Sequence, residues 1–301
     1  MSAGDAPLTL RGAADRTAPR FGTVVIVGGG CYGSYYLRQL GRAVAAGALA
    51  CRRVLVVDRD PGCQVARALA ADAPPAAPGG PPQPQYAPAD PAVADPFRAA
   101  SIEVRLVVSD WAAFLWGYLA GDAPGGAAAG VRDDDAIVPS PLMPHLLYDW
   151  LLHRARARWP QRRVETVPLR RAPDTPWQRS VPDGTQYVSF AEWMCPVNCI
   201  EPRTCPETRG PRTWSLPRAL AAYAAEEGAA GHPVEGPLIF HCTHRAYGVG
   251  MIDLRDVLAA DRRLAAVAAA GGARVLVATV SHCHGAANLL AVGDSGPAPY
   301  A

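Results

Sequence analysis

A glycine-rich turn directly after an apolar run constrains the fold of this chain more than any other feature. Residues 21–47 have the sequence FGTVVIVGGGCYGSYYLRQLGRAVAAG, which predicts a buried strand, a glycine turn and a long helix. The next apolar run, RRVLVVDRD at residues 52–60, predicts a second strand that ends in an acidic residue. The chain is therefore expected to contain a β-α-β unit near its start.

Three glycines in the turn match the pattern G-x-G-x-x-G. Gly28 permits the tight turn, Gly30 lets the backbone approach a pyrophosphate, and Gly33 lets the helix and strand pack closely. The N-terminus of the helix favours the negative charge of a phosphate. Asp58 ends the second strand, where a carboxylate can accept hydrogen bonds from ribose hydroxyls. Over residues 22–60 the chain resembles the Rossmann-type NAD(P)/FAD-binding superfamily.

That resemblance implies a dinucleotide cofactor near Gly28, Gly30, Gly33 and Asp58. NAD(P) is the expected cofactor and FAD is the alternative. NAD is favoured over NADP because Asp58 would repel a 2′-phosphate, although the adjacent Arg59 leaves NADP open. The same turn could instead bind S-adenosylmethionine, or no nucleotide at all.

Further apolar runs extend the expected sheet. The predicted fold class is α/β, with a doubly wound, mostly parallel Rossmann-like sheet and a cysteine-rich, proline-broken insertion. In the C-terminal third, a strand, an amphipathic helix and a second strand should form a parallel pair with a right-handed connection. This pair would bring the motifs HCTH (241–244) and SHCHG (281–285) to one edge of the sheet. The expected strands lie near residues 23–27, 53–57, 103–108, 237–241 and 274–280.

Composition divides the chain into four parts. Residues 1–20 are expected to be a flexible tail, and residues 21–138 the nucleotide-binding domain. A proline-rich stretch within that domain, residues 73–98, is expected to be disordered. Residues 139–216 are expected to be a helical, cysteine-rich, metal-binding segment over the strand ends. Residues 217–301 would be an α/β unit that completes the sheet.

Three cysteines lie close together in the sequence CPVNCIEPRTC. Cys195, Cys199 and Cys205 match neither a zinc-knuckle spacing nor the usual ferredoxin spacings. The prolines among them stiffen the loop and reduce the entropy that is lost when three thiolates converge. Thiolates are preferred ligands of Zn²⁺ and of iron–sulfur clusters. The sequence therefore predicts a zinc or iron–sulfur centre on these cysteines, with Cys242 and Cys283 as further candidate ligands.

Histidines accompany the last two cysteines at the expected strand ends. Side chains alternate along a strand, so a histidine and the cysteine beside it should point to opposite faces, and not all of them can bind one centre. The carboxyl ends of parallel strands are where open α/β sheets place their ligands. The candidate acid/base residues, which could also supply a metal ligand, are His241, His244, His282 and His284.

The arginine-only basic composition removes several functions. All 29 basic residues are arginine, so Schiff-base chemistry, a P-loop lysine and a lysine general base are excluded. The net charge of +2 is spread along the chain, so nucleic acid is not an expected partner. The sequence shows neither a signal peptide nor an apolar stretch of membrane-spanning length. A cytoplasmic location and a small-molecule substrate are therefore expected, without a membrane partner, and the oligomeric state is left open.

The function predicted from these features is a nucleotide-dependent oxidoreductase with a cysteine-ligated metal or iron–sulfur centre. One alternative is a non-catalytic protein that senses redox state, metal or nucleotide with the same parts. A second alternative is an S-adenosylmethionine-dependent transferase whose cysteines hold a structural zinc.

Overall fold

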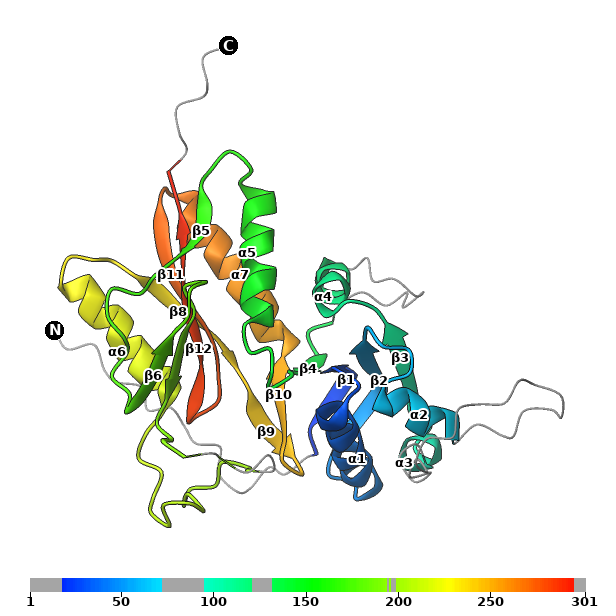
Figure 1. The fold of residues 1–301 in the computed structure, drawn as a ribbon. Coiled ribbons are helices and arrows are strands. Elements are labelled where there is room, and N and C mark those ends of the chain that lie inside the picture. The colour runs from blue at the N-terminus through cyan, green and yellow to red at the C-terminus, as the bar shows by residue number, and fades with distance from the viewer. Residues whose placement is uncertain (1–17, 72–94, 121–131, 194, 196–198, 295–301) are drawn as a thin grey trace.

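The chain folds around two mixed β-sheets, shown in Figure 1. One large core cluster contacts both of them, because it contains Val25 and Val57 of the first sheet and Val277 and Leu290 of the second. The two sheets therefore share a continuous apolar core. The described part of the chain contains no helix with the length and apolar character needed to cross a membrane. The computed structural model describes residues 18–71, 95–120, 132–193, 195 and 199–294.

The first sheet has the strand order β3-β2-β1-β4-β10-β9. The first four strands in this order are parallel, whereas β10 runs antiparallel to both β4 and β9. Apolar side chains alternate between its two faces, with Val24 and Ile26 on one and Val25 and Val27 on the other. The strands are β1 (Arg20–Val27), β2 (Ala50–Asp58), β3 (Glu103–Val108), β4 (Ala136–Val138), β9 (Thr243–Ala246) and β10 (Val249–Asp253).

Helices cover both faces of the first sheet. Leu37 and Leu40 of α1 are spaced by nearly one helical turn, and they pack with Phe97 of α3 on the face of Val24 and Ile26. Phe114 and Leu115 of α4 pack on the opposite face. The helices are α1 (Cys31–Ala45), α2 (Gln64–Ala71), α3 (Asp95–Ala99) and α4 (Trp111–Ala120).

The second sheet has the order β6-β7-β12-β11-β8, with β5 paired to β12 beyond the end of β7. Of its pairings only β8 with β11 is parallel. Helices α5 and α7 cover one face, and α6 covers the other (Figure 1). The elements are β5 (Val164–Val167), β6 (Trp177–Ser180), β7 (Gln186–Ser189), β8 (Glu235–His241), β11 (Ala273–Val280), β12 (His284–Val292), α5 (Leu146–Arg158), α6 (Leu216–Ala229) and α7 (Leu254–Ala269).

The predicted doubly wound, mostly parallel sheet is wrong. The strands expected to complete it, β8 and β11, belong to the second sheet, and the antiparallel strands β10 and β9 extend the first sheet in their place. The second sheet is mixed because a three-residue connection joins β11 to β12, and so short a connection forces an antiparallel pair. Apolar runs identify buried strands, but they do not say which strand pairs with which.

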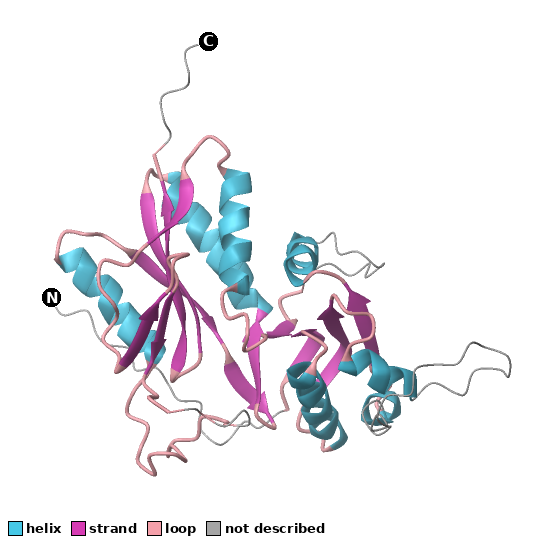
Figure 2. Ribbon diagram, viewed as in Figure 1, coloured by secondary structure: helices cyan, strands magenta, loops and turns pink. Residues whose placement is uncertain are grey.

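Two local predictions are confirmed. Strands β1 and β2 are parallel on either side of α1, as expected for a β-α-β unit, and β8 is parallel to β11. Within residues 139–216, helix α5 and strands β5, β6 and β7 are parts of the second sheet and its covering layer, while the described residues between β7 and α6 form loops (Figure 2). The predicted tail and proline-rich insertion lie mostly outside the described residues, although β1 begins at Arg20 and α3 covers residues 95–99.

Candidate functional site

The three motif glycines occupy three different environments in the turn between β1 and α1. Gly28 has a φ of +93°, which L-residues rarely adopt, and its N–H donates to the carbonyl of Val57 at 2.8 Å. A Cβ on Gly33 would overlap the carbonyl oxygen of Gly28, so helix and turn touch there. Gly30 is exposed, and a Cβ on it would meet nothing within 4 Å. The turn thus presents an open backbone surface at Gly30.

The N-terminus of α1 has no side-chain cap. Its N-cap residue is Gly30, the first turn carries no acidic residue, and the first helical hydrogen bond runs from the N–H of Ser34 to the carbonyl of Gly30 at 2.9 Å. The backbone N–H groups before Ser34 have no partner within the helix. The helix dipole adds a partial positive charge at the same place. This end of α1 is electrostatically suited to an anion.

Asp58 lies beside the glycine turn and helps to hold it. One carboxylate oxygen accepts the N–H of Gly29 at 2.6 Å and the other accepts the N–H of Asp60 at 2.9 Å. Each carboxylate oxygen has two lone pairs, so both can accept a further hydrogen bond. The neighbouring Arg59 forms an ion pair with Asp110 at 3.0 Å and lies over the ring of Trp111. The ribose-binding role of Asp58 stays a prediction.

The glycine between the first two motif positions has a packing role that the sequence analysis missed. A Cβ on Gly29 would lie 2.5 Å from the sulfur of Cys63, which is buried just before α2. Burial raises the pKa of the Cys63 thiol. The run of three glycines was the available signal, since G-x-G-x-x-G leaves its second position free.

The two histidine motifs meet at one edge of the second sheet, as predicted. His241 ends β8 and pairs in register with Val280, the last residue of β11. The rings of His241 and His282 stack with their centroids 5.1 Å apart. His244 lies in β9, where its Nδ1 is 3.1 Å from the carbonyl oxygen of Gly248. His284 begins β12.

Glu201 contacts His282 and acts electrostatically on His241 and His284. Its carboxylate accepts the backbone N–H of His282, at 3.1 and 3.3 Å from its two oxygens. Burial raises the pKa of Glu201, but a hydrogen bond from Ser281 and the nearby imidazoles of His244 and His282 outweigh it, so the pKa lies below its usual value. The φ of Glu201 is +50°, a strained value for this residue type, and such strain is common at functional sites.

Glu201 was the main residue that sequence reasoning could not place. Its only sequence signal was its position between Cys199 and Cys205, which says nothing about the distant segment that it contacts. The backbone carbonyl of Glu201 also accepts a hydrogen bond from the guanidinium of Arg212. The residue is therefore held on both its side chain and its backbone.

Two of the histidines are held in the neutral form at neutral pH. Burial is the main cause that lowers the pKa of His241, and the nearby His282 lowers it further. Burial also lowers the pKa of His284, and it outweighs the nearby Glu201 carboxylate, which raises that pKa. A neutral imidazole can accept a proton, so these side chains have the charge state of general bases.

The loop that carries Cys199 and Cys205 contacts the turn between β11 and β12 through Glu201 and Trp214. Cys205 and Cys283 are buried, and the indole Nε1 of Trp214 donates to the Cys283 sulfur at 3.3 Å. Burial raises the pKa of Cys195, and the nearby thiols of Cys199 and Cys205 raise it further. The pKa of Cys205 is lowered, mainly because the backbone N–H of Thr208 hydrogen-bonds to its sulfur.

Cys242 lies apart from the other candidate ligands. A Cβ on Gly250 of β10 would be 2.5 Å from its sulfur, so this thiol faces the first sheet. Burial raises the pKa of Cys242 to about 12. The pKa of Tyr36 in α1 is also raised to about 12, mainly by burial and then by the nearby Cys242 thiol. All eight cysteines are free thiols, and no three of the described His, Cys, Asp and Glu side chains are arranged to hold a metal ion.

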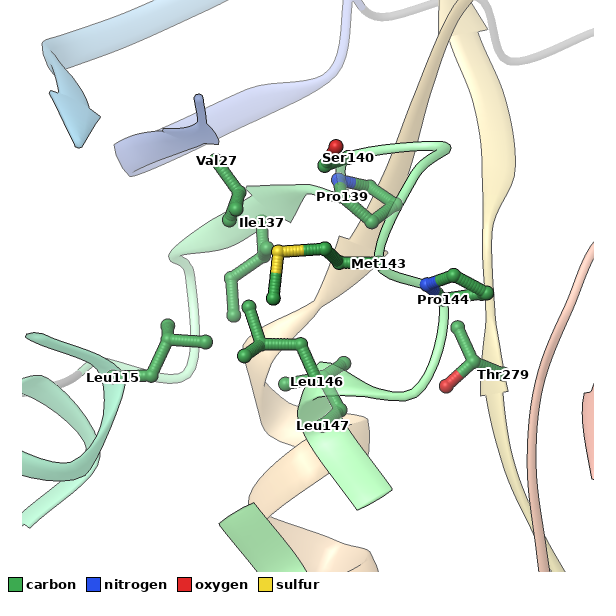
Figure 3. A pocket seen from close by; sticks show the side chains of 10 residues that line it. All are labelled: Val27, Leu115, Ile137, Pro139, Ser140, Met143, Pro144, Leu146, Leu147 and Thr279. Atoms are coloured by element: carbon green, nitrogen blue, oxygen red, sulfur yellow. The ribbon is translucent and has the colours of Figure 1, made fainter. Parts of the chain in front are cut away.

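A small apolar pocket separates the end of β1 from β11 (Figure 3). Its volume is about 10 Å³, which is room for one water molecule. Val27 lines it just before the glycine turn, Met143 projects into it, and Thr279 lines the side of the second sheet. The hydroxyl of Thr279 is buried and has no hydrogen-bond partner. This residue carried no sequence signal.

Comparison with known proteins gives one family match. Residues 147–293 match the family model AF_1314_C, described as "Uncharacterized protein, C-terminal domain". The match covers just under half of the chain and includes the histidine cluster and the cysteine loop, but not the glycine turn. No curated protein and no solved structure matches this chain.

Proposed function

We propose that this chain is a nucleotide-dependent oxidoreductase that binds a dinucleotide at the glycine turn and uses the histidine cluster for proton transfer. The observation that carries the proposal is the division of roles among Gly28, Gly30 and Gly33. The first has a positive φ, the second leaves open space, and the third allows helix and turn to touch. These are the three roles that a pyrophosphate-binding turn requires.

The electrostatics of the turn support the same ligand. A pyrophosphate would meet the uncapped N-terminus of α1, where no acidic side chain of the first turn opposes it. Asp58 lies at the end of β2 beside Gly29, where its carboxylate oxygens can accept further hydrogen bonds from ribose hydroxyls. NAD(P) is the proposed cofactor class and FAD the alternative. Either would supply hydride transfer when bound.

Helix α1 connects the proposed nucleotide site to the histidine cluster. It begins next to Gly30, and its Tyr36 lies near Cys242, beside the cluster. Tyr36 is six positions after Gly30, which is about 9 Å along a helix at about 1.5 Å per residue. A dinucleotide has two ends, so one that binds its pyrophosphate at the turn can extend toward the cluster.

The histidine cluster contains side chains that could transfer the proton of the substrate during a hydride-transfer reaction. Interconversion of an alcohol and a carbonyl requires a group that takes or gives the hydroxyl proton. His241 and His284 are held neutral and can accept that proton, and the Glu201 carboxylate would stabilise an imidazolium. The substrate is proposed to be a small molecule.

The cysteine-ligated zinc or iron–sulfur centre remains part of the proposal. Thiols are suitable ligands for such a centre in their chemistry, but the described side chains are not arranged to hold a metal ion. We therefore assign it no step in the reaction. A cytoplasmic location stays a prediction.

Titration calorimetry on the purified chain tests the nucleotide site. We expect NAD⁺, NADP⁺ or FAD to bind, and Gly30→Glu to weaken that binding at least tenfold, because the new carboxylate would repel the pyrophosphate in space that is open at Gly30. Gly228→Glu is the matched control, since Gly228 in α6 also has no neighbour within 4 Å of a Cβ. Binding of S-adenosylmethionine alone would favour a transferase, and binding of none would refute the proposal.

A further inference from the structure

We propose that the small pocket between the end of β1 and β11 receives the redox-active ring of the nucleotide, and that the hydroxyl of Thr279 hydrogen-bonds to the carbonyl or amide group of that ring. In the free protein the side chain of Met143 occupies this place. The inference rests on the proposed nucleotide-dependent function. It goes further because it assigns the ring to named residues outside the glycine turn.

The pocket lies next to the proposed pyrophosphate site. Its wall on the first sheet includes Val27, the last residue of β1, and Gly28 of the glycine turn follows directly. In NAD(P) and in FAD a single sugar or sugar-alcohol unit joins the redox-active ring to the pyrophosphate, so the ring lies one such unit from the turn. On the second sheet, Thr279 precedes Val280, which pairs in register with His241. A ring in the pocket would therefore lie between the turn and the strand end that carries the histidine cluster.

The hydroxyl of Thr279 is the polar group in the pocket that lacks a partner. Thr279 follows Val275 and Val277 on one face of β11, and these valines pack in the core that both sheets share. Its side chain points toward the pocket (Figure 3), it is only 7% exposed, and its hydroxyl has no hydrogen-bond partner in the described part of the chain. The other hydroxyl in the lining, on Ser140, accepts the N–H of Leu142 at 3.3 Å. A buried hydroxyl without a partner costs free energy, and a carbonyl or amide group on a ligand would remove that cost.

The rest of the lining suits a flat ring. Eight of the ten lining side chains are aliphatic, proline or methionine, and they include Ile137 of β4 and Leu146 of α5. Sites for small ligands are mostly apolar, with a few polar groups that fix the orientation of the ligand. One unpartnered hydroxyl in an apolar wall fits the edge of a ring that carries a carbonyl or amide group. It does not fit a phosphate, which requires several donors or a positive charge.

Met143 fills the pocket in the free protein. The space that remains beside its side chain has room for one water molecule only. This side chain is half-buried at the edge of the shared core, and it is an unbranched, flexible chain. Rotation of the side chain would withdraw its sulfur and methyl group and open space for one edge of the ring.

The backbone beside the pocket can stay in place during that rotation. The N–H of Met143 donates to the carbonyl of Ser140 at 3.1 Å, and its own carbonyl accepts the N–H of Leu146 at 3.4 Å. Pro141 and Pro144 also restrict the backbone on either side of Met143, because the proline ring fixes φ. Exchange between the methionine side chain and the ring therefore requires no rearrangement of the loop.

Titration calorimetry with matched ligands tests the assignment on the full-length chain. ADP-ribose is NAD⁺ without its nicotinamide ring, so the ratio of the two dissociation constants measures the contribution of the ring, and ADP serves as the ring-free ligand for FAD. We expect Thr279→Val to lower the preference for the ring-bearing ligand about fivefold, the effect of one hydrogen bond, and to leave binding of the ring-free ligand unchanged. We expect Met143→Ala to raise the preference about threefold or more, because the ring no longer competes with the methionine side chain.

Leu142→Ala and Thr23→Val are the matched controls. Leu142 is adjacent to Met143, but it is 74% exposed and does not line the pocket, so its truncation should leave the preference unchanged. Thr23 lies four residues before Val27 in β1, and its hydroxyl accepts a hydrogen bond from Arg53. Thr23→Val should therefore lower stability without changing the preference. Thr279→Val should do the reverse, which a merely structural threonine would not.

Three results would overturn the inference. These are an unchanged preference in Thr279→Val, equal effects of Met143→Ala and Leu142→Ala, and equal affinities for the ring-bearing and ring-free ligands in every variant. In each case the nucleotide site at the glycine turn would stand, because the ring-free ligand measures that site separately. If neither the ring-bearing nor the ring-free ligands bind, the proposed function is refuted and this inference with it.

Discussion

Replacing Gly33 by alanine should destabilise the chain, although alanine is the better helix former. In an open helical position the change gains about 1 kcal/mol from helix propensity. At Gly33 the added Cβ would overlap the carbonyl oxygen of Gly28, well inside the 3.0 Å that Cβ atoms keep from other heavy atoms. That oxygen is backbone and cannot rotate away, so α1 must move relative to β1, and overpacking of this kind costs about 1–3 kcal/mol or more. We expect a net loss of about 1–2 kcal/mol from the free energy of unfolding.

Gly228→Ala is the matched control, because Gly228 is helical and a Cβ there meets nothing within 4 Å. It should gain up to about 1 kcal/mol, so the two alanine variants should differ by about 1–3 kcal/mol. Urea unfolding curves with unchanged slopes would measure this difference. Equal stability of the two variants would refute the close approach of helix and turn. In the same variant, a shifted turn should also weaken nucleotide binding.

Two further predictions concern buried polar groups. Thr279→Val should leave stability unchanged or raise it by up to about 1 kcal/mol, because the lost hydroxyl is buried without a partner. Thr23→Val is the control, because it removes a hydroxyl that accepts a hydrogen bond from Arg53 at 2.8 Å, and it should lower the free energy of unfolding by about 1 kcal/mol in the same assay. A loss of that size in Thr279→Val would contradict the prediction, because it would mean that the Thr279 hydroxyl has a partner. Asp261→Asn should lose about 1–2 kcal/mol at neutral pH, since this carboxylate binds Arg154 and Arg158 and those arginines are partly exposed. Burial raises the Asp261 pKa, but these partners outweigh it and depress the pKa, so the stability that they add is present above the unfolded value of about 4 and is lost as pH falls through the folded pKa. A wild-type advantage over Asp261→Asn that persists below both values would contradict this reasoning.

Local chemistry predicted the elements of this fold better than their arrangement. The runs at residues 23–27, 53–57 and 103–108 are strands, because a buried strand needs a continuous apolar segment and the sequence displays it. Strands β9 and β10 are short and contain glycine and charged residues, so no such segment marked them. The antiparallel pairing of β10 with β4, in which Ile252 lies opposite Ile137, is a tertiary choice. That choice turned an expected single sheet into two.

In the candidate site, too, the sequence predicted local features better than contacts between distant segments. Register and alternation follow from strand geometry alone, so the meeting of His241 with His282 and the separation of Cys242 from His241 could both be deduced from the sequence. Glu201 could not be placed, because its contact with His282 spans 81 residues and is made from a loop without periodicity. Thr279 appears in its strand as one more β-branched residue, and only the packing around it reveals a hydroxyl without a partner.

The β9–β10 hairpin makes the two parts of the proposed site interdependent. The hairpin lies within the region that matches the family model. Its contacts reach outside that region, because β10 pairs with β4 and the N–H of Leu254, which follows β10, donates to the carbonyl of Asp135. The same hairpin carries His244, places Gly250 against Cys242, and packs Tyr247 against Arg42 of α1 through a cation–π contact. The helix that begins at the glycine turn therefore also packs, through Arg42 in its last turn, against the hairpin that carries His244. The glycine turn and the cluster share this support, which is the physical reason to treat them as one site.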